Sequence, residues 1–155
     1  MRVIFLDFDG VLNSAKYLAR VGGEGLVIDP VPMALLQKIV KATGAEIVLS
    51  TSWREHWSED PAECDGIGSL ISSIFRAHGL QILGKTPQRP AGRERQIKCW
   101  LDDHPETENF VVLDDMLLYA DYLEGHFVKT SNHFDGLDES DAARAIAILT
   151  KEVQT

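Results

Sequence analysis

The chain has 155 residues, of which 45% are hydrophobic and 25% charged, and its formal net charge is −9. This length and composition suit one globular domain, so residues 1–155 are expected to form a single unit. The acidic balance argues against a broad basic surface for nucleic acid, and no apolar run approaches the roughly 20 residues that span a bilayer. We expect a cytoplasmic protein with its native start and no membrane partner.

The first apolar run, residues 3–6, is followed at once by Asp7, Asp9 and Gly10. The run predicts a buried strand whose carboxyl end presents both acids, at the edge where open α/β sheets carry their chemistry. Residues two apart in an extended chain point the same way, so both acids would face one small volume unless a turn at Gly10 re-aims the second. A cation between the carboxylates would relieve their repulsion. For this stretch alone, a solvated acidic turn is an equally good explanation.

A short helix and a glycine-rich segment would form a small mobile flap over residues 14–28, above the two acids. Asp29 and Pro30 carry the signals of a helix start, as N-cap and first-turn proline, and Gly44 carries the signal of its end. Residues 45–49 then predict the second strand.

Hydroxyl side chains follow the second predicted strand. Ser52 and Glu55 fit a capping box, which favours a structural role for Ser52. Ser50, the first residue past the apolar run, is not explained by that cap. Its hydroxyl, together with backbone N–H groups at the next helix start, would suit a phosphate.

Helix and strand signals alternate along the rest of the chain, which predicts an α/β fold: a three-layer, Rossmann-like, mainly parallel five-stranded sheet with right-handed crossovers. The remaining predicted elements are a surface loop over 57–66, a helix over 67–77, a strand over 80–83, a proline-containing loop over 85–90, a helix over 93–101, a strand over 110–113, a strand at 127–128 and a last helix opened by Asp138.

The fourth strand also ends in two acids, Asp114 and Asp115. Before it lies a basic island in an acidic chain, which suggests a confined anion rather than a long polyanion. Because the carboxyl ends of parallel strands share one edge of the sheet, these groups would meet there. Oxygen-only ligands favour Mg²⁺ over zinc or copper. The island consists of Lys85, Arg89, Arg93, Arg95 and Lys98 against Glu94 alone.

The order of these residues resembles the haloacid dehalogenase (HAD) superfamily of phosphohydrolases. The family pattern is Asp-x-Asp-Gly after the first strand, Ser or Thr after the second, Lys or Arg before the fourth, and an acid pair after it. Each part has a match here. Within the superfamily, residues 49–54 and 92–101 are more weakly similar to small HAD domains associated with nucleic-acid end repair. The short segments after the first and second motifs imply little or no cap.

The resemblance implies a magnesium-dependent phosphomonoester hydrolase. Asp7 would attack phosphorus and form an aspartyl-phosphate, and Asp9 would protonate the leaving oxygen and later deprotonate water. Mg²⁺ would be held by Asp7, the carbonyl oxygen of Asp9 and Asp114. Asp115 would orient metal-bound water or the active-site cation. The phosphoryl oxygens would be held by Ser50 and by backbone N–H groups near Gly10 and Thr51.

The identity of the active-site cation stays open among residues of the basic island. Arg93, at the start of the helix before the fourth strand, is the first choice, and Lys85, which precedes a Thr-Pro, is the second. Arg95 and Lys98 are further alternatives. Each would equally serve as a solvated helix charge.

Two other functions are compatible with these residues. A phosphotransferase or mutase shares all of them, whereas a non-catalytic module that binds magnesium or phosphate would not need Asp9 as an acid–base. An open site would admit bulky phosphorylated substrates, such as a nucleotide or a nucleic-acid end. Arg54, Trp53 and Trp57 would then bind phosphate and stack on a base, although packing is the commoner role of tryptophan.

Overall fold

A parallel sheet forms the centre of the protein in the computed structural model, which describes residues 1–130 and 134–151. The five strands lie in the order β3-β2-β1-β4-β5, and every neighbouring pair is parallel. The predicted α/β fold with a five-stranded sheet is confirmed. Residues 131–133 and 152–155 of the predicted domain lie outside the described part. The strands are β1 (Arg2–Leu6), β2 (Glu46–Leu49), β3 (Ile82–Lys85), β4 (Asn109–Asp114) and β5 (Phe127–Lys129).

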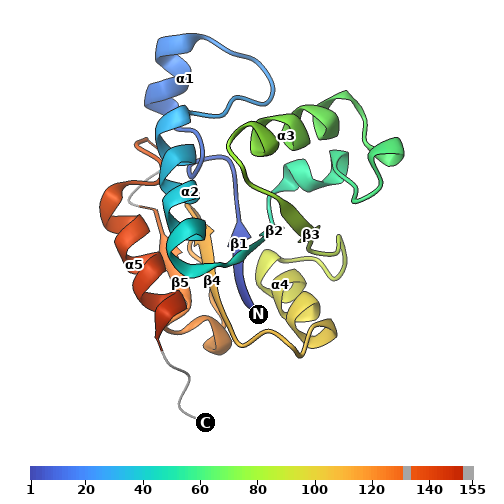
Figure 1. The fold of residues 1–155 in the computed structure, drawn as a ribbon, viewed down its shortest axis with the longest axis vertical. Coiled ribbons are helices and arrows are strands. Elements are labelled where there is room, and N and C mark those ends of the chain that lie inside the picture. Colours follow the sequence, from blue (N-terminus) through green and yellow to red (C-terminus); the bar gives the residue numbers. More distant parts are fainter. Residues whose placement is uncertain (131–133, 152–155) are drawn as a thin grey trace.

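Helices cover both faces of the sheet and give the predicted three layers (Figure 1). On one face α2 (Pro30–Thr43) packs beside α5 (Glu139–Thr150), and α3 (Gly66–Ala77) joins the same core cluster. On the other face lie α4 (Arg93–Asp103) and the short 3₁₀ helix η3 (Asp121–Leu123). Among the described residues, no helix combines the length and apolar character needed to cross a bilayer.

The side chains of β1 divide between the two cores. Ile4 and Leu6 belong to the cluster under α2 and α5, and Val3 and Phe5 to the cluster under α4. This alternation follows from the two-residue period of a strand, and it explains why a strand buried on both faces appears as an uninterrupted apolar run. Packing on both faces therefore fixes β1 as far as Leu6, the residue before Asp7.

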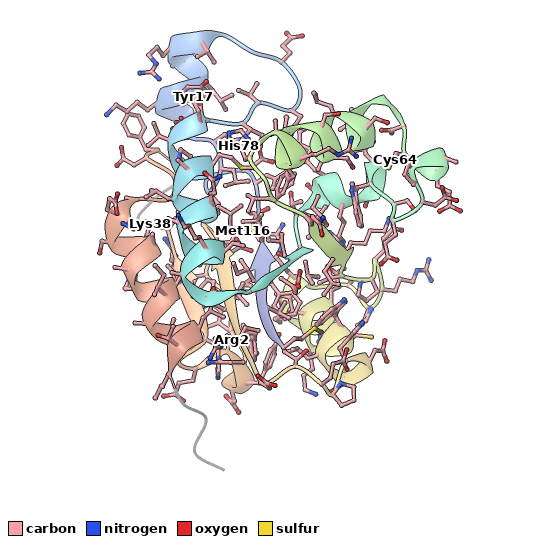
Figure 2. All side chains as sticks on the ribbon, viewed as in Figure 1. Arg2, Tyr17, Lys38, Cys64, His78 and Met116 are labelled. Atoms are coloured by element: carbon pink, nitrogen blue, oxygen red, sulfur yellow. The ribbon has the colours of Figure 1, made fainter. Side chains whose placement is uncertain are left out.

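Local capping signals place the helices much as the sequence predicted. The side chain of Asp29 accepts a hydrogen bond from the Val31 N–H at the start of α2, and Gly44 ends the helix in the left-handed conformation with φ of 66°. At the start of α5, Asp138 and Asp141 form a reciprocal capping box. Near it, Lys38 of α2, labelled in Figure 2, pairs with Glu139 at 2.8 Å.

The third strand lies later than predicted. β3 covers Ile82–Lys85 rather than residues 80–83, and the Leu80 N–H donates to the Phe75 carbonyl oxygen at the end of α3. Leu80 is nevertheless buried, so its apolar character reports packing under the helix end and not strand membership. The surface loop predicted over residues 57–66 contains one short 3₁₀ helix, η2 (Pro61–Glu63).

The capping box predicted at Ser52 is wrong. The turn after β2 is a 3₁₀ helix, η1 (Ser52–His56), and its N-cap is Thr51, whose side chain accepts from the Trp53 N–H. Ser52 is exposed, whereas Thr51 is fully buried. The cap therefore lies one residue earlier, which assigns the Thr51 side chain to the backbone.

Candidate active site

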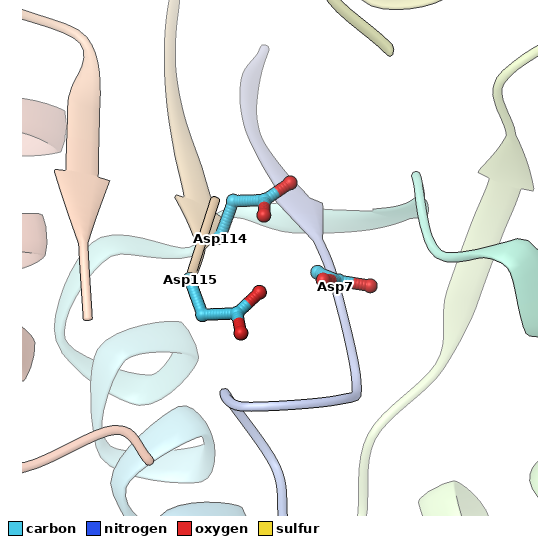
Figure 3. A group of neighbouring side chains, drawn as sticks. All are labelled: Asp7, Asp114 and Asp115. Carbon is cyan, nitrogen blue, oxygen red and sulfur yellow. The ribbon is translucent and has the colours of Figure 1, made fainter. Parts of the chain in front are cut away.

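Three carboxylates meet at the carboxyl edge of the two central strands. Asp7 follows β1, Asp114 is the last residue of β4, and Asp115 follows it (Figure 3). One oxygen from each lies within 4.8 Å of the others. The proximity follows from the register, because Leu6 pairs with Leu113 and the Asp7 N–H continues the ladder to the Leu113 carbonyl oxygen at 3.0 Å. The sequence predicted that the strand ends would place Asp7, Asp9, Asp114 and Asp115 at one edge, and the structure brings the carboxylates of Asp7, Asp114 and Asp115 together there.

Arg93 supplies the positive charge beside this acidic cluster. Its Nη1 atom lies 2.9 Å from Asp7 Oδ2 and 2.5 Å from Asp114 Oδ2, so one guanidinium bridges both buried carboxylates. Arg93 is the first residue of α4, after Gly92 with φ of 101°. The helix start therefore turns this side chain toward the sheet edge, at the position that sequence made the first choice for the cation.

The cluster holds more negative charge than Arg93 neutralises. Burial raises the pKa of the Asp7 carboxyl to about 6, with the Asp114 charge acting in the same direction and Arg93 opposing both. Burial likewise raises the pKa of the Asp114 carboxyl against the effect of Arg93. For Arg93, burial acts to lower the pKa, but the two carboxylates outweigh it and hold that pKa above its usual value. The site therefore favours a further cation.

Gly10 lets the loop after β1 approach the second acid pair. Its φ is +76°, and a Cβ atom there would lie 2.3 Å from Asp115 Oδ2, so both the backbone and the space require glycine. The Gly10 carbonyl oxygen accepts from the buried Thr130 hydroxyl at 2.8 Å, and its N–H donates to Asn13 Oδ1 at 3.0 Å. That N–H is thus already engaged, so the structure does not support the expectation that it binds phosphate.

Ser50 brings a hydroxyl group to the same edge. It follows Leu49, the partner of Leu6 in the ladder between β1 and β2, which places it beside Asp7. Ser50 is fully buried, and its Oγ has no hydrogen-bond partner among the residues that the structure describes. A buried hydroxyl without a partner costs free energy, which an incoming oxygen acceptor would recover. The Thr51 N–H, by contrast, donates to the Leu6 carbonyl oxygen and does not support the expected phosphate contact.

The side chain of Asp9 lies apart from the three-acid cluster and has its own partners. Its Oδ1 accepts from Asn13 Nδ2 and its Oδ2 from Trp53 Nε1, each at 3.0 Å. Sequence reasoning did not assign Asn13 a role and expected Trp53 to stack or pack. The expectation that Asp7 and Asp9 both face one small volume is therefore not met in full, because the Asp9 oxygens face Asn13 and Trp53, and the group of close carboxylates consists of Asp7, Asp114 and Asp115.

Arg54 is buried and serves the loops around the site. It donates to the carbonyl oxygens of Ser50, Thr51, Thr86 and Pro87 and to Gln96 Oε1. These contacts use all five N–H groups of the guanidinium, so none remains for a substrate phosphate. The predicted substrate-binding role is not supported, and Arg54 instead joins the β2–η1 turn to the β3–α4 loop. Burial, followed by the nearby Arg93 charge, lowers its pKa.

The other candidate cations lie away from the acids or are paired elsewhere. Lys85 donates to the carbonyl oxygens of Arg54 and Trp57, which ties β3 to η1. Lys98 pairs with Asp102 along the exposed side of α4, and Arg95 is exposed on the same helix. The structure therefore places Arg93 alone of these four residues against Asp7 and Asp114.

The predicted flap projects from the carboxyl edge of the sheet as α1 (Ala15–Val21) and the loop after it (Figure 1). The side chain of Ser14 caps α1, and α1 buries none of its residues. Asn13 Nδ2 donates to the Val27 carbonyl oxygen at 3.0 Å, so the flap is tied back to the loop that carries Asp9. Between β1 and α2, the described chain thus adds only this small element at the carboxyl edge of the sheet.

The donor set fits a hard divalent cation. Asp7, Asp114 and Asp115 offer only carboxylate oxygens, which suit Mg²⁺ rather than a soft metal. Asp114 Oδ1 also accepts from the Met116 N–H at 2.9 Å, which fixes the orientation of this carboxylate. The three acids would hold the ion. Its positive charge would favour the ionised form of Asp7 and so lower the pKa that burial raises.

The family model described as "HAD domain in Swiss Army Knife RNA repair proteins" matches residues 3–142. The match runs from β1 into α5 and includes every candidate residue described above. Searches of curated proteins and of solved structures returned no match.

Proposed function

Because the chain belongs to the HAD superfamily, in the family of HAD domains of Swiss Army Knife RNA repair proteins, we propose that it is a magnesium-dependent phosphomonoester hydrolase. The observation that carries the proposal is the bridge from Arg93 to Asp7 and Asp114 beside a third carboxylate. This arrangement provides an anionic nucleophile next to positive charge, which phosphoryl transfer requires.

The reaction proceeds in two displacements. Asp7 attacks phosphorus through a carboxylate oxygen, the bond from phosphorus to the ester oxygen breaks, and Asp9 gives its proton to that leaving oxygen. Asp9 then takes a proton from water as the water oxygen attacks the aspartyl-phosphate, which releases inorganic phosphate and restores Asp7. Each cycle consumes one water, and Asp9 ends it protonated, as it began.

Three other groups stabilise charge on the transferring phosphoryl group. Arg93, at the start of α4, attracts its oxygens while it orients Asp7, and the unpartnered Ser50 hydroxyl donates to one of them. Mg²⁺ bound by Asp7, Asp114 and Asp115, together with the Asp9 carbonyl oxygen, would neutralise charge between these acids and the phosphate.

The substrate proposed is a phosphate on a nucleotide or a nucleic-acid end. Two observations support it: the family description names RNA repair proteins, and between β1 and α2 the described chain inserts one short helix, α1, which is too small to be a large cap. The net charge of −9 favours recognition of a terminal phosphate over contact with a long stretch of backbone.

The first test is phosphate release with magnesium from p-nitrophenyl phosphate, followed by nucleotides and by 5′- and 3′-phosphorylated RNA and DNA oligonucleotides. Asp7→Asn should reduce turnover to roughly a thousandth or less, because an amide does not form the aspartyl-phosphate. Asp103→Asn, which changes an exposed acid at the end of α4, is the matched control and should retain activity. Undiminished turnover in Asp7→Asn would refute the assigned nucleophile.

A further inference from the structure

The two carboxylate oxygens of Asp9 are held from two different parts of the chain. Asn13, on the loop after β1, donates to Oδ1, and Trp53, on η1 after β2, donates to Oδ2, both at 3.0 Å. Two fixed donors at the two ends of one carboxylate define its plane as well as its position. Single-point anchoring would leave the group free to rotate about χ2.

Both donors are themselves fixed by the surrounding structure. Asn13 is 3% exposed, and besides Asp9 its amide group binds the Gly10 N–H and the Val27 carbonyl oxygen, so its rotamer is determined from three directions. Trp53 lies in the first turn of η1, where its own N–H donates to the capping hydroxyl of Thr51. The backbone at the start of η1 therefore fixes the position from which the indole N–H points to Asp9.

This arrangement leaves Asp9 able to carry a proton. A carboxylate has about four lone-pair directions, two on each oxygen, and the two N–H donors occupy one on each. The remaining directions are available for the proton that an acid–base group gives and takes. A hydrogen-bonded carboxylate with a fixed plane keeps the transferred proton near the line of the leaving oxygen, whereas a rotating one does so only part of the time.

We propose that Trp53 is a positioning residue for the acid–base carboxylate of Asp9, acting through its indole N–H with Asn13 as the opposite anchor. The proposal rests on the proposed function, since it concerns the proton transfer in that reaction. It also gives the tryptophan of the Ser-Thr-Ser-Trp-Arg segment a role distinct from stacking on a base. Loss of the indole N–H should matter most when the leaving oxygen needs a proton, and least when it leaves as a stable anion.

The activity test compares aryl phosphates of similar shape whose leaving groups differ in basicity: p-nitrophenyl, phenyl and p-methoxyphenyl phosphate. For Trp53→Phe we expect kcat/KM to fall no more than about threefold with p-nitrophenyl phosphate but about 10- to 100-fold with the two basic leaving groups. The plot of log kcat/KM against leaving-group pKa therefore becomes steeper. In an Asp9→Asn background the same substitution should add no further steepening, because the positioned acid is already absent.

Trp57→Phe is the matched control. It removes an indole N–H bond of the same length, which runs 3.0 Å to Ser72 Oγ and not to Asp9, from the residue that follows η1. This variant should leave the slope of the plot unchanged even if it lowers stability. An equal loss on all three substrates in Trp53→Phe, or the same steepening in Trp57→Phe, would overturn the proposal.

A second measurement tests the contact without activity. The chain has three tryptophans, and the Trp53→Phe variant identifies the Trp53 indole signal in a ¹H–¹⁵N spectrum. In Asp9→Ala this signal should move upfield as its hydrogen bond is lost, while the Trp57 and Trp100 signals stay in place. A Trp53 indole signal with the same chemical shift in Asp9→Ala as in the wild type would refute the contact. A clear shift in a protein that releases no phosphate instead contradicts the proposed function, and the positioning role with it.

Discussion

Single side chains at the strand ends carry charges that only their neighbours make tolerable. Asp7 is 4% exposed and Asp114 is fully buried, and one guanidinium lies between them. Two buried carboxylates with one cation remain short of positive charge, and burial accordingly raises the pKa of both. Because positive charge is short at these carboxylates, the site favours binding of a metal ion.

Arg93→Ala tests the cation at the level of one residue. We expect kcat/KM for p-nitrophenyl phosphate to fall roughly 100- to 1,000-fold, because Asp7 loses its orienting partner and the phosphoryl oxygens lose a positive charge. Arg95→Ala, an exposed arginine in the first turn of the same helix, is the control and should change kcat/KM little. Equal effects of the two substitutions would show that a diffuse positive charge, and not Arg93 itself, supports the reaction.

At the level of elements, the site depends on loops that are joined behind it. Arg54 ties the turn between β2 and η1 to the loop between β3 and α4, and Lys85 ties the end of β3 to η1. These bonds fix the start of α4 relative to β2, and hence Arg93 relative to Ser50. Arg54, which the sequence suggested as a phosphate ligand, thus holds together the loops that position the site.

Arg54→Met tests this structural role. The substitution keeps the length of the side chain but leaves several buried carbonyl oxygens without donors, so the free energy of unfolding should fall by about 2–4 kcal/mol. Arg76→Met, at an exposed position on α3, should change it by less than about 0.5 kcal/mol. Both are measured by urea unfolding followed by tryptophan fluorescence. Unchanged stability together with a large rise in KM would restore the substrate-binding interpretation of Arg54.

For the whole molecule, the buried charge of Asp7, which the proposed reaction needs, lowers the free energy of unfolding. The pKa of Asp7 is about 6 in the folded protein and 3.8 for an ordinary aspartate, so the folded state holds this proton more tightly than the unfolded chain. The free energy of unfolding therefore decreases as pH rises between about 4 and 6, and the destabilisation is complete above that range.

Asp7→Asn should consequently be more stable than the wild type in the absence of metal. At pH 7, with a chelator present, we expect its free energy of unfolding to be higher by roughly 1–3 kcal/mol, since a neutral amide replaces a buried charge. At pH 4 the difference should shrink toward zero because Asp7 is then protonated. Urea unfolding at both pH values measures it, and a variant less stable than wild type at pH 7 would contradict this account of the site.

Much of the architecture followed from local patterns. The apolar runs that became β1 and β4 are central strands buried on both faces, and the caps at Asp29, Gly44 and Asp138 are short-range signals in which a side chain or a left-handed glycine serves the nearest backbone groups. Prediction failed where apolar character alone served as the signal for a strand. Leu80 looks like a strand residue because it is apolar, yet it packs under the end of α3.

The sequence by itself determined that Asp7 would meet Asp114 and Asp115, because parallel strands that end in these residues must present them at one edge. It did not determine how the polar groups pair. A buried arginine that holds loop carbonyls and one that bridges two carboxylates look alike along the chain, and only the tertiary structure separated Arg54 from Arg93. The same holds for the indole N–H of Trp53 on Asp9, because hydrogen bonds are directional and short, and their partners here are 44 residues apart.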